Sequence, residues 1–387
     1  MRYKELDSMR GLAALFVVFS HCMLVIPIYG GYKGGLPEQT ALSIILRDSP
    51  LHLFWSGHES VILFFLLSGF VLSLPFYNKK QLSYGKYIIR RTCRIYIPYV
   101  ISIIFAISMF SIFQTETDIN GVSDWFNKLW DHPTNIKLII SHVFFIGDYN
   151  TYAYNSVIWS LAHEMRISLL FPLLMIVVMK LDWKKSTILS LIISFISLLL
   201  VSKLGVAKNH YLYTLHYLTI FIVGALLAKH RYELIGLYNK ITTFSKITVF
   251  MIGTLFYTYS FLLPSMKIIH KNIINEWMTV IGAAIFVILA MSSNLFKKIL
   301  SKRSINYIGE ISYSLYLYHM PILIAVIYVS NEHFPLWISL VLAIVISIIV
   351  SSIAYYLVEK PSVKIGRKLS QINFKNKTEY INNSKVS

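Results

Sequence analysis

Hydrophobic segments recur along the whole chain, separated by polar stretches that are mostly short. A helix needs about 20 predominantly apolar residues to cross a bilayer core, and about ten segments approach this length. The predicted spans are 11–28, 59–76, 95–113, 156–179, 187–204, 212–228, 247–264, 276–294, 307–330 and 336–358. The pattern predicts an all-α fold, a polytopic integral membrane helical bundle. The apolar stretch 137–147 is too short to span, so we expect it to lie at the interface or to dip in and return.

The composition agrees with a membrane protein. Of the 387 residues, 56% are hydrophobic and 14% are charged, and the mean hydropathy is +0.61. A soluble domain carries about a quarter charged residues. No break in composition marks a soluble domain, so we expect one transmembrane domain over 1–370. The polar, Asn- and Lys-rich stretch 371–387 is predicted to be a disordered cytoplasmic tail.

The net charge of +18 could suggest nucleic-acid binding. However, the basic residues fall in short loops between apolar segments, and cytoplasmic loops of membrane proteins carry an excess of Lys and Arg. With the N-terminus inside, the inner segments hold more than three times as many of these residues as the outer segments. We therefore expect both termini in the cytoplasm, an even number of spans and no nucleic-acid partner.

The first span carries an acidic, a basic and an imidazole side chain on one stripe. Arg10 stands at its mouth and His21 lies deep inside it, about three turns and roughly 16 Å further along the axis. Asp7 precedes Arg10 by three residues, so the two can be neighbours. A polar group inside a membrane helix indicates function by default. His21 could instead be a packing histidine, and Arg10 an ordinary basic residue at the interface.

Two arginines follow the second span. Arg91 and Arg94 are three residues apart and share one helix face. Paired guanidinium groups at the inner leaflet can bind phosphates bidentately. They can equally bind anionic lipid headgroups.

Two later spans carry polar stripes. Ser160 and Glu164 recur at four-residue spacing in the fourth span, and an intramembrane carboxylate needs a partner or a task. Tyr316 and His319 share a stripe of the ninth span, and Pro321 frees a backbone carbonyl nearby. A structural hydrogen bond to a neighbouring helix would explain His319 as well as catalysis does.

Two outer loops are long, 29–58 and 114–155. The second is rich in acidic and aromatic residues, among them Trp125 and Trp130, which suit sugar binding but also an interfacial aromatic belt. The two cysteines, Cys22 and Cys93, differ in depth, so we expect no disulfide. No zinc spacing, Gly-rich phosphate loop or nucleophile elbow is present, so neither a metal site nor a covalent serine enzyme is indicated.

Taken together and in order, these stretches resemble the membrane-bound acyltransferase family 3, bacterial enzymes that O-acylate surface glycans and related acceptors. The resemblance covers nearly the whole chain. It rests on six motifs: Leu6-Asp7 through His21, Phe65-Leu66-Leu67-Ser68-Gly69-Phe70, Arg91-x-x-Arg94 with Ile97-Pro98, Trp159-Ser160-Leu161 with Glu164 and Phe171-Pro172, Tyr313-Ser314-Leu315-Tyr316-Leu317-x-His319-x-Pro321, and Glu359-Lys360-Pro361.

The resemblance implies acyl-coenzyme A (acyl-CoA), usually acetyl-CoA, as a co-substrate, with no bound cofactor. It implies a hydroxyl acceptor on a cell-surface or lipid-linked glycan, such as O-antigen or exopolysaccharide, and a multi-pass location in a bacterial cytoplasmic (inner) membrane. The basic residues fit this independently. Coenzyme A is a cytosolic anion rich in phosphate, and the inner face offers three candidate donor-binding arginines: Arg10, Arg91 and Arg94.

A hydroxyl is a poor nucleophile and gains from a general base with a pKa near the working pH, which describes a neutral histidine. We therefore expect His21 to take the proton of the acceptor, or to carry the acyl group briefly. Arg10, held by Asp7, would position the donor. Glu164 and His319 would bind or orient the acceptor from the outer side, supported by Tyr316 and Ser160. The candidate catalytic residues are therefore His21, Arg10 and Glu164.

The chain departs from the family pattern at one position. Family members often have an aromatic residue four positions after the glutamate, where this chain has Ser168, so no role is carried over there. Some relatives carry an extracytoplasmic hydrolase-like domain after the spans. This sequence ends without one, so a separate extracytoplasmic partner enzyme could complete the transfer.

Two other functions stay open from the sequence. One is O-acylation of a small molecule or a membrane lipid. The other is a non-enzymatic transporter or flippase of a polar lipid or sugar intermediate, in which the polar intramembrane residues line a path. An enzyme would consume acyl-CoA, whereas a flippase would move its substrate unchanged.

Overall fold

The computed structural model describes residues 3–31, 40–78, 83–114, 118–131, 135–144, 149–206, 210–259 and 270–383. These residues form helices and no strand. Nine of the described helices are long and apolar enough to cross a membrane: α1 (Lys4–Val25), α4 (Gly57–Tyr77), α5 (Tyr84–Phe113), α8 (Ile158–Lys180), α9 (Trp183–Leu204), α10 (Tyr211–Lys229), α14 (His270–Ser292), α16 (Arg303–Ser330) and α17 (Leu336–Ala354). The predicted polytopic helical membrane bundle is confirmed.

Shorter helices connect or cap the long ones. They are α2 (Pro27–Gly30), α3 (Ala41–Asp48), a 3-10 helix over Pro50–Trp55, α6 (Asp124–Asn127), α7 (Ile136–Val143), α11 (Arg231–Lys240), α12 (Thr243–Tyr257) and α15 (Asn294–Leu300). The predicted span 247–264 corresponds to α12, which is shorter than a span, and 260–264 lies outside the described residues. The stretch 137–147 forms α7 up to Val143, which contacts α5 through the Tyr96 hydroxyl.

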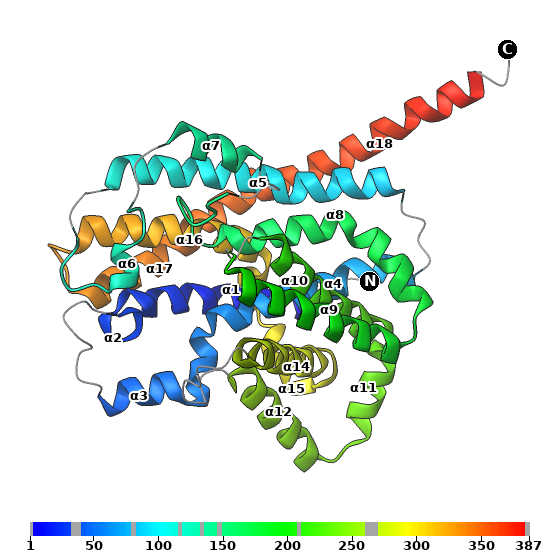
Figure 1. Cartoon of the computed structure of the whole chain (residues 1–387), viewed down its shortest axis with the longest axis horizontal. Helices are drawn as coiled ribbons and strands as arrows, with labels where there is room; N and C mark the ends of the chain where they lie inside the picture. Colours follow the sequence, from blue (N-terminus) through cyan, green and yellow to red (C-terminus); the bar gives the residue numbers. More distant parts are fainter. Residues whose placement is uncertain are drawn as a thin grey trace.

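The last two long helices are joined by a π-helical turn. α17 continues through this turn (Tyr355–Glu359) into α18 (Lys360–Asn383). Pro361 explains the turn, because proline has no N–H and its ring clashes with the carbonyl four residues back. The Lys360 N–H correspondingly donates to the Tyr355 carbonyl, five residues back. α18 projects away from the bundle (Figure 1) and is helical as far as Asn383. The composition, by contrast, predicts a disordered tail over 371–387.

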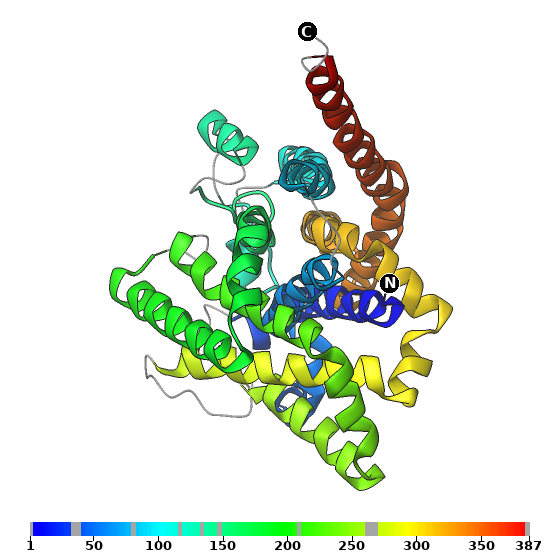
Figure 2. The same ribbon diagram turned by 90° about the vertical axis from the view of Figure 1, so that its right-hand side faces the viewer.

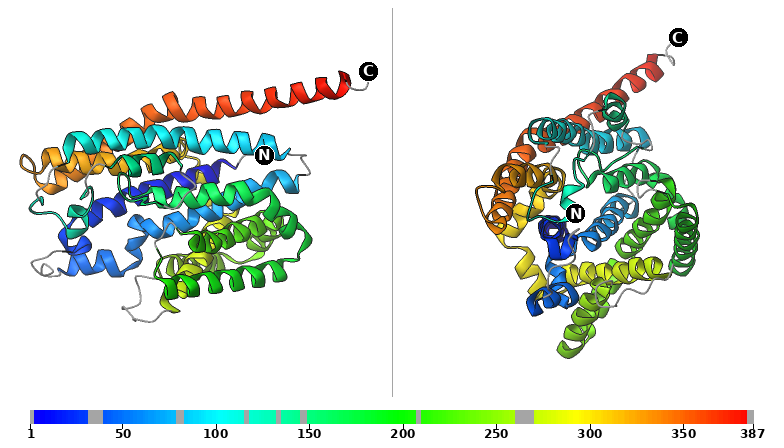
Figure 3. Two further views of the ribbon diagram at one scale, coloured as in Figure 1. Left: turned by 45° about the horizontal axis from the view of Figure 1, so that its top comes forward. Right: turned by 60° about the vertical axis from the view of Figure 1, so that its left-hand side comes forward.

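α1, α5 and α16 run roughly alongside one another, whereas α14 crosses them steeply (Figures 1 and 2). α1 lies near the middle of the bundle (Figure 3). α1 packs against α16 and α4, and α4 packs against α10. The first and last described residues lie toward the same end of the molecule (Figure 3). We call this the inner end, because the distribution of Lys and Arg assigns it to the cytoplasm.

Two glycine contacts set the spacing of the central helices. A Cβ atom at Gly11 would overlap the backbone of Gly309 in α16, and a Cβ atom at Gly69 would overlap the backbone of Phe221 in α10. Small residues let membrane helices approach closely, which is the role that we infer for Ser68-Gly69. The contact between α1 and α16 brings the polar stripes of the first and ninth spans face to face.

Candidate active site

The two deep imidazoles predicted from the sequence meet in the structure. The Nδ1 atom of His21 on α1 lies 3.0 Å from the Nε2 atom of His319 on α16. Their ring centroids are 5.1 Å apart. Residues separated by 298 positions thus form one pair. This contact favours a shared site over two separate packing histidines.

The backbone fixes where the protons of this pair lie. The Nδ1 atom of His319 is 2.9 Å from the Leu315 carbonyl oxygen, which can only accept, so Nδ1 carries the hydrogen. A neutral imidazole has one N–H, so the Nε2 atom of His319 is the acceptor for Nδ1–H of His21. The Nε2 atom of His21 then keeps its lone pair, the state that a general base requires.

An aromatic side chain of the second long outer loop covers His21. The ring of Trp125, in α6, stacks on the His21 imidazole with centroids 5.8 Å apart and planes at 14°. Ser123 anchors α6 to the outer end of α1, since its hydroxyl donates to the Leu24 carbonyl (2.6 Å) and its N–H to the Val25 carbonyl (2.9 Å). Trp130, by contrast, is buried and donates to the Tyr154 carbonyl, which is a packing role.

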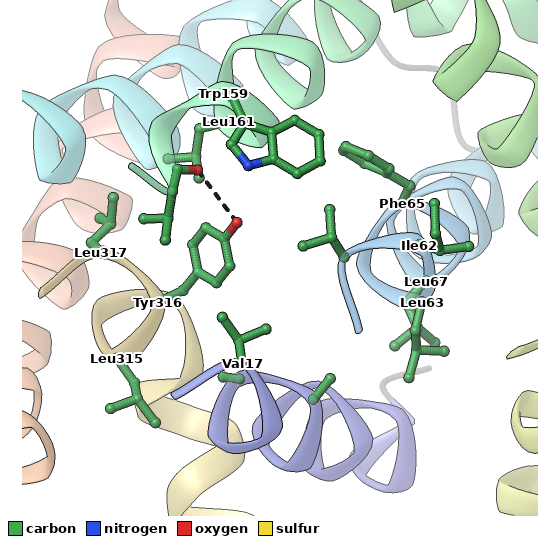
Figure 4. Close-up of a cluster of buried hydrophobic side chains, with 14 of the residues drawn as sticks. Val17, Ile62, Leu63, Phe65, Leu67, Trp159, Leu161, Leu315, Tyr316 and Leu317 are labelled. Carbon is green, nitrogen blue, oxygen red and sulfur yellow. Dashed lines mark hydrogen bonds between the residues drawn. The ribbon is translucent and has the colours of Figure 1, made fainter. Parts of the chain in front are cut away.

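Tyr316 and Ser160 join α16 to α8 on the inner side of this pair. The two hydroxyl oxygens are 2.7 Å apart, and both hydroxyls also lie within hydrogen-bonding distance of the Val157 carbonyl. Figure 4 shows Tyr316 between Val17 of α1 and Trp159 of α8, with its hydroxyl directed at α8. The Tyr316 ring lies 6.0 Å from that of His319. The predicted stripe of the ninth span is therefore continuous with the imidazole pair.

Glu164 has its partner on another helix. Its Oε1 accepts from Arg91 of α5 at 2.7 Å, and the Ser68 hydroxyl lies 3.4 Å from the same oxygen. We expected Glu164 on the acceptor side, but its ion pair places it with a predicted donor-binding arginine. The charge of Arg91 is correspondingly matched by a carboxylate.

Ser168, the departure from the family pattern, completes this contact. Its hydroxyl accepts from the Nε atom of Arg91 at 3.0 Å, and its carbonyl accepts from the Tyr87 hydroxyl at 2.9 Å. The guanidinium group of Arg91 is thus held by two residues on one face of α8, Glu164 and Ser168. A short polar side chain is needed here for the hydrogen bond, which the sequence could not reveal.

A cavity of about 600 Å³ opens at the inner end of the bundle. Arg10, Arg94 and Asp7 all line it, from α1 and α5. The Nε atom of Arg10 is buried without a hydrogen-bond partner among the described residues, and Arg94 is exposed to this space. Two guanidinium groups thus line a cavity that is large enough for part of a ligand, and three carboxylates, those of Asp7, Glu310 and Glu359, line it too.

A second, much smaller cavity lies deeper in the bundle. Arg10, Ser312 and Tyr313 line both cavities, and the smaller one adds Glu164, Ser160 and Tyr316. The lining therefore leads from the inner cavity toward the hydroxyl pair that adjoins His319. Six predicted site residues line the two cavities, whereas His21, His319 and Arg91 are not among the lining residues.

The sequence did not predict two of the polar clusters. Glu359, in the π-helical turn, accepts from the Ser314 hydroxyl at 2.7 Å and lines the inner cavity. It lay in a motif of the resemblance but had no predicted role. Glu276 of α14 lies 2.6 Å from His58 and 3.8 Å from His216. No local spacing could join these three residues, since they come from three helices.

The chain is similar in sequence to known proteins over most of its length. Residues 3–356 match a family described as an acyltransferase domain, acyltransferase 3. The chain is 26% identical to O-acetyltransferase OatA of Staphylococcus aureus (strain MRSA252), over 89% of this chain and 59% of that protein. It is 22% identical to YrhL of Bacillus subtilis (strain 168), a protein named for peptidoglycan O-acetylation, over 84% of this chain and 54% of that protein. The chain thus spans a little over half the length of these relatives. No solved structure matches.

Proposed function

We propose, on the premise that this chain belongs to the acyltransferase 3 family, that it moves an acetyl group from cytosolic acetyl-CoA to a hydroxyl of a cell-envelope glycan. The names of the relatives, O-acetyltransferases and in one case a peptidoglycan O-acetyltransferase, support acetyl as the group and a glycan as the acceptor. The protein would act as a multi-pass protein of a bacterial cytoplasmic membrane. The observation that carries the proposal is the His21–His319 pair.

His21 is the general base in this proposal. Its Nε2 lone pair takes the proton of the acceptor hydroxyl, whose oxygen attacks the thioester carbonyl. The carbon–sulfur bond breaks as the ester bond forms, and the leaving CoA thiolate takes the proton from His21. His319 acts through His21: it accepts the Nδ1–H hydrogen bond and so holds the imidazole in the required tautomer.

Arg10 serves the donor and does not reach the reacting carbonyl. It lies about three turns, roughly 16 Å, from His21 on the same helix. Arg10 and the exposed Arg94 line the inner cavity, where their guanidinium groups can bind phosphate oxygens. Arg91 is already paired with Glu164, so it supports the wall of the site and its charge balance.

Trp125 gives the acceptor a binding surface. It comes from the outer loop and stacks on the His21 ring. An aromatic ring can pack against the apolar face of a sugar, and Asp124, beside it in α6, can accept hydrogen bonds from sugar hydroxyls. The donor and acceptor would therefore approach the imidazole pair from opposite ends of the bundle.

The test compares strains that lack the gene and are complemented with wild type, His21→Ala, His319→Ala or His319→Gln at matched protein levels. Alkali-labile acetate on the purified envelope glycan is measured. Loss of a general base lowers the rate by about 10²–10⁴-fold, so we expect no acetate with His21→Ala. We expect a strong loss with His319→Ala and partial recovery with His319→Gln, whose amide oxygen can accept from His21.

Wild-type acetate levels with His21→Ala would disprove the catalytic assignment. Equal acetate in the deletion and wild-type strains would disprove the glycan acceptor. Equal activity of His319→Ala and His319→Gln, both well below wild type, would show that His319 does not act by accepting the Nδ1 hydrogen bond.

A further inference from the structure

The inner cavity is lined by more cations than the predicted arginines. α18 contributes Lys360, Lys364 and Arg367 to its wall. Residues four and seven positions apart lie on one helix face, so the three cations form one stripe.

Two features turn this stripe toward the cavity. The π-helical turn before α18 adds one residue to a helical turn, which rotates everything after it by about 100° relative to an uninterrupted α-helix. On the side facing α5, a Cβ atom at Gly366 would lie 2.9 Å from the Cβ atom of Cys93, and the Ser370 hydroxyl accepts from Arg90 at 2.8 Å. α18 is thus docked on α5 by one face and presents another to the cavity.

The outer two cations of the stripe are available to a ligand. Lys364 and Arg367 are exposed and line the cavity, and neither forms an ion pair with another described residue. Lys360 differs, because its ammonium group sits over the Tyr356 ring, 5.3 Å from the centroid. The carboxylate of Glu359, at the base of the stripe, accepts from Ser314.

The depth of the cations can be compared with the order of the groups in coenzyme A. Its thioester lies at the end of a long arm, the diphosphate follows, and the 3′-phosphate of the ribose lies furthest from the sulfur. Arg10 is the deepest of these cations, because it also lines the smaller cavity. Arg94 follows Cys93, which packs against Gly366, so it lies at about the level of Lys364 and Arg367. An acyl group directed at His21 would leave the 3′-phosphate at the mouth of the cavity.

We propose that Lys364 and Arg367 form a binding site for the 3′-phosphate of the donor nucleotide, with Arg10 and Arg94 binding the diphosphate. This inference rests on the proposed function, because it assumes a CoA thioester as donor. A phosphate monoester on the donor and the phosphate of an anionic lipid headgroup share the chemistry that such cations recognise. The test must therefore separate the two sources.

The experiment measures the Kd of CoA and of 3′-dephospho-CoA by isothermal titration, with the full chain in phosphatidylcholine nanodiscs. Charge-assisted hydrogen bonds to phosphate predict that wild type prefers CoA by about 10-fold or more. In the double variant Lys364→Ala/Arg367→Ala, the Kd of CoA should rise to that of 3′-dephospho-CoA, whose own Kd should hardly change. Lys368→Ala is the matched control, an exposed lysine of α18 that does not line the cavity, and it should keep the preference.

Each outcome separates the two proposals. If wild type binds both compounds equally, or the double variant keeps the full preference for CoA, the 3′-phosphate site is wrong although a CoA donor stands. If wild type has no preference and the double variant instead loses retention of phosphatidylglycerol in mixed nanodiscs, the cations bind lipid. If wild type binds neither compound, the proposed donor is wrong, and the site is wrong with it.

Discussion

His319 shows how one backbone carbonyl can set the chemistry of a neighbouring side chain. Because Leu315 occupies its Nδ1–H, the other nitrogen must accept from His21, and the lone pair of His21 is left on Nε2. Glu164 shows the complementary case, in which an acidic residue inside a membrane helix is matched by Arg91 of another helix. From the sequence, His319 could be a packing or a functional residue, and Glu164 needed either a partner or a task. The structure supplies a second imidazole beside His319 and an arginine partner for Glu164.

The Arg91–Glu164 pair is open to a double-mutant cycle. Removing one partner of a buried ion pair costs about 3–5 kcal/mol, because the other charge stays buried without it. We expect Arg91→Met and Glu164→Leu each to lower the unfolding midpoint in detergent strongly. The double variant should be less destabilised than the sum of the two, since neither charge remains.

The control for this cycle is an exposed ion pair. Lys185 lies 3.5 Å from Asp182 with most of its side chain exposed, so Lys185→Ala should change stability by less than about 1 kcal/mol. Additive effects of Arg91→Met and Glu164→Leu would show that the two residues do not stabilise the bundle as a pair.

At the scale of the element, α1 and α16 act as one unit. Their close approach at Gly11 and Gly309 sets the distance between the two backbones. Ten positions beyond each of these glycines lie His21 and His319, the histidines of the pair. Helix spacing therefore controls the geometry of the site from nearly three turns away.

Gly11→Ala tests this coupling. The added methyl group would overlap the α16 backbone, so α1 must shift. A displacement of about 1 Å can cost on the order of 10²-fold in rate, and we expect a loss of this size in glycan acetate at matched protein level. Gly236→Ala in α11 is the control, because nothing lies within 4 Å of its added Cβ atom. Wild-type activity of Gly11→Ala would contradict the role of this contact.

At the scale of the whole molecule, the inner cavity and the outer loop that carries Trp125 are separate surfaces. The inner end holds the large cavity and its arginines, whereas the outer loop brings Trp125 onto His21. The proposed reaction needs this separation, because its donor is cytosolic and its acceptor lies outside. Orientation in the membrane is therefore part of the mechanism.

Reporter fusions test that orientation. Green fluorescent protein fused after the last residue should fluoresce, since it folds on the cytoplasmic side. Alkaline phosphatase inserted at Asn331, which follows α16 at its outer end, should be active, because it needs the outer compartment. The reverse pattern, a dark C-terminal fusion with inactive phosphatase at Asn331, would invert the molecule and exclude the inner cavity as a site for a cytosolic donor.

The sequence by itself determined the helical class, nearly all the spans, and the polar residues that needed an explanation. These follow from local properties: the length of an apolar run and the cost of a polar group within it. Only the tertiary structure decided the partners: His319 for His21, Arg91 for Glu164, and the cavity for the cations of α18. Periodicity orders residues along one helix, whereas the choice of partner depends on how helices distant in sequence pack against one another.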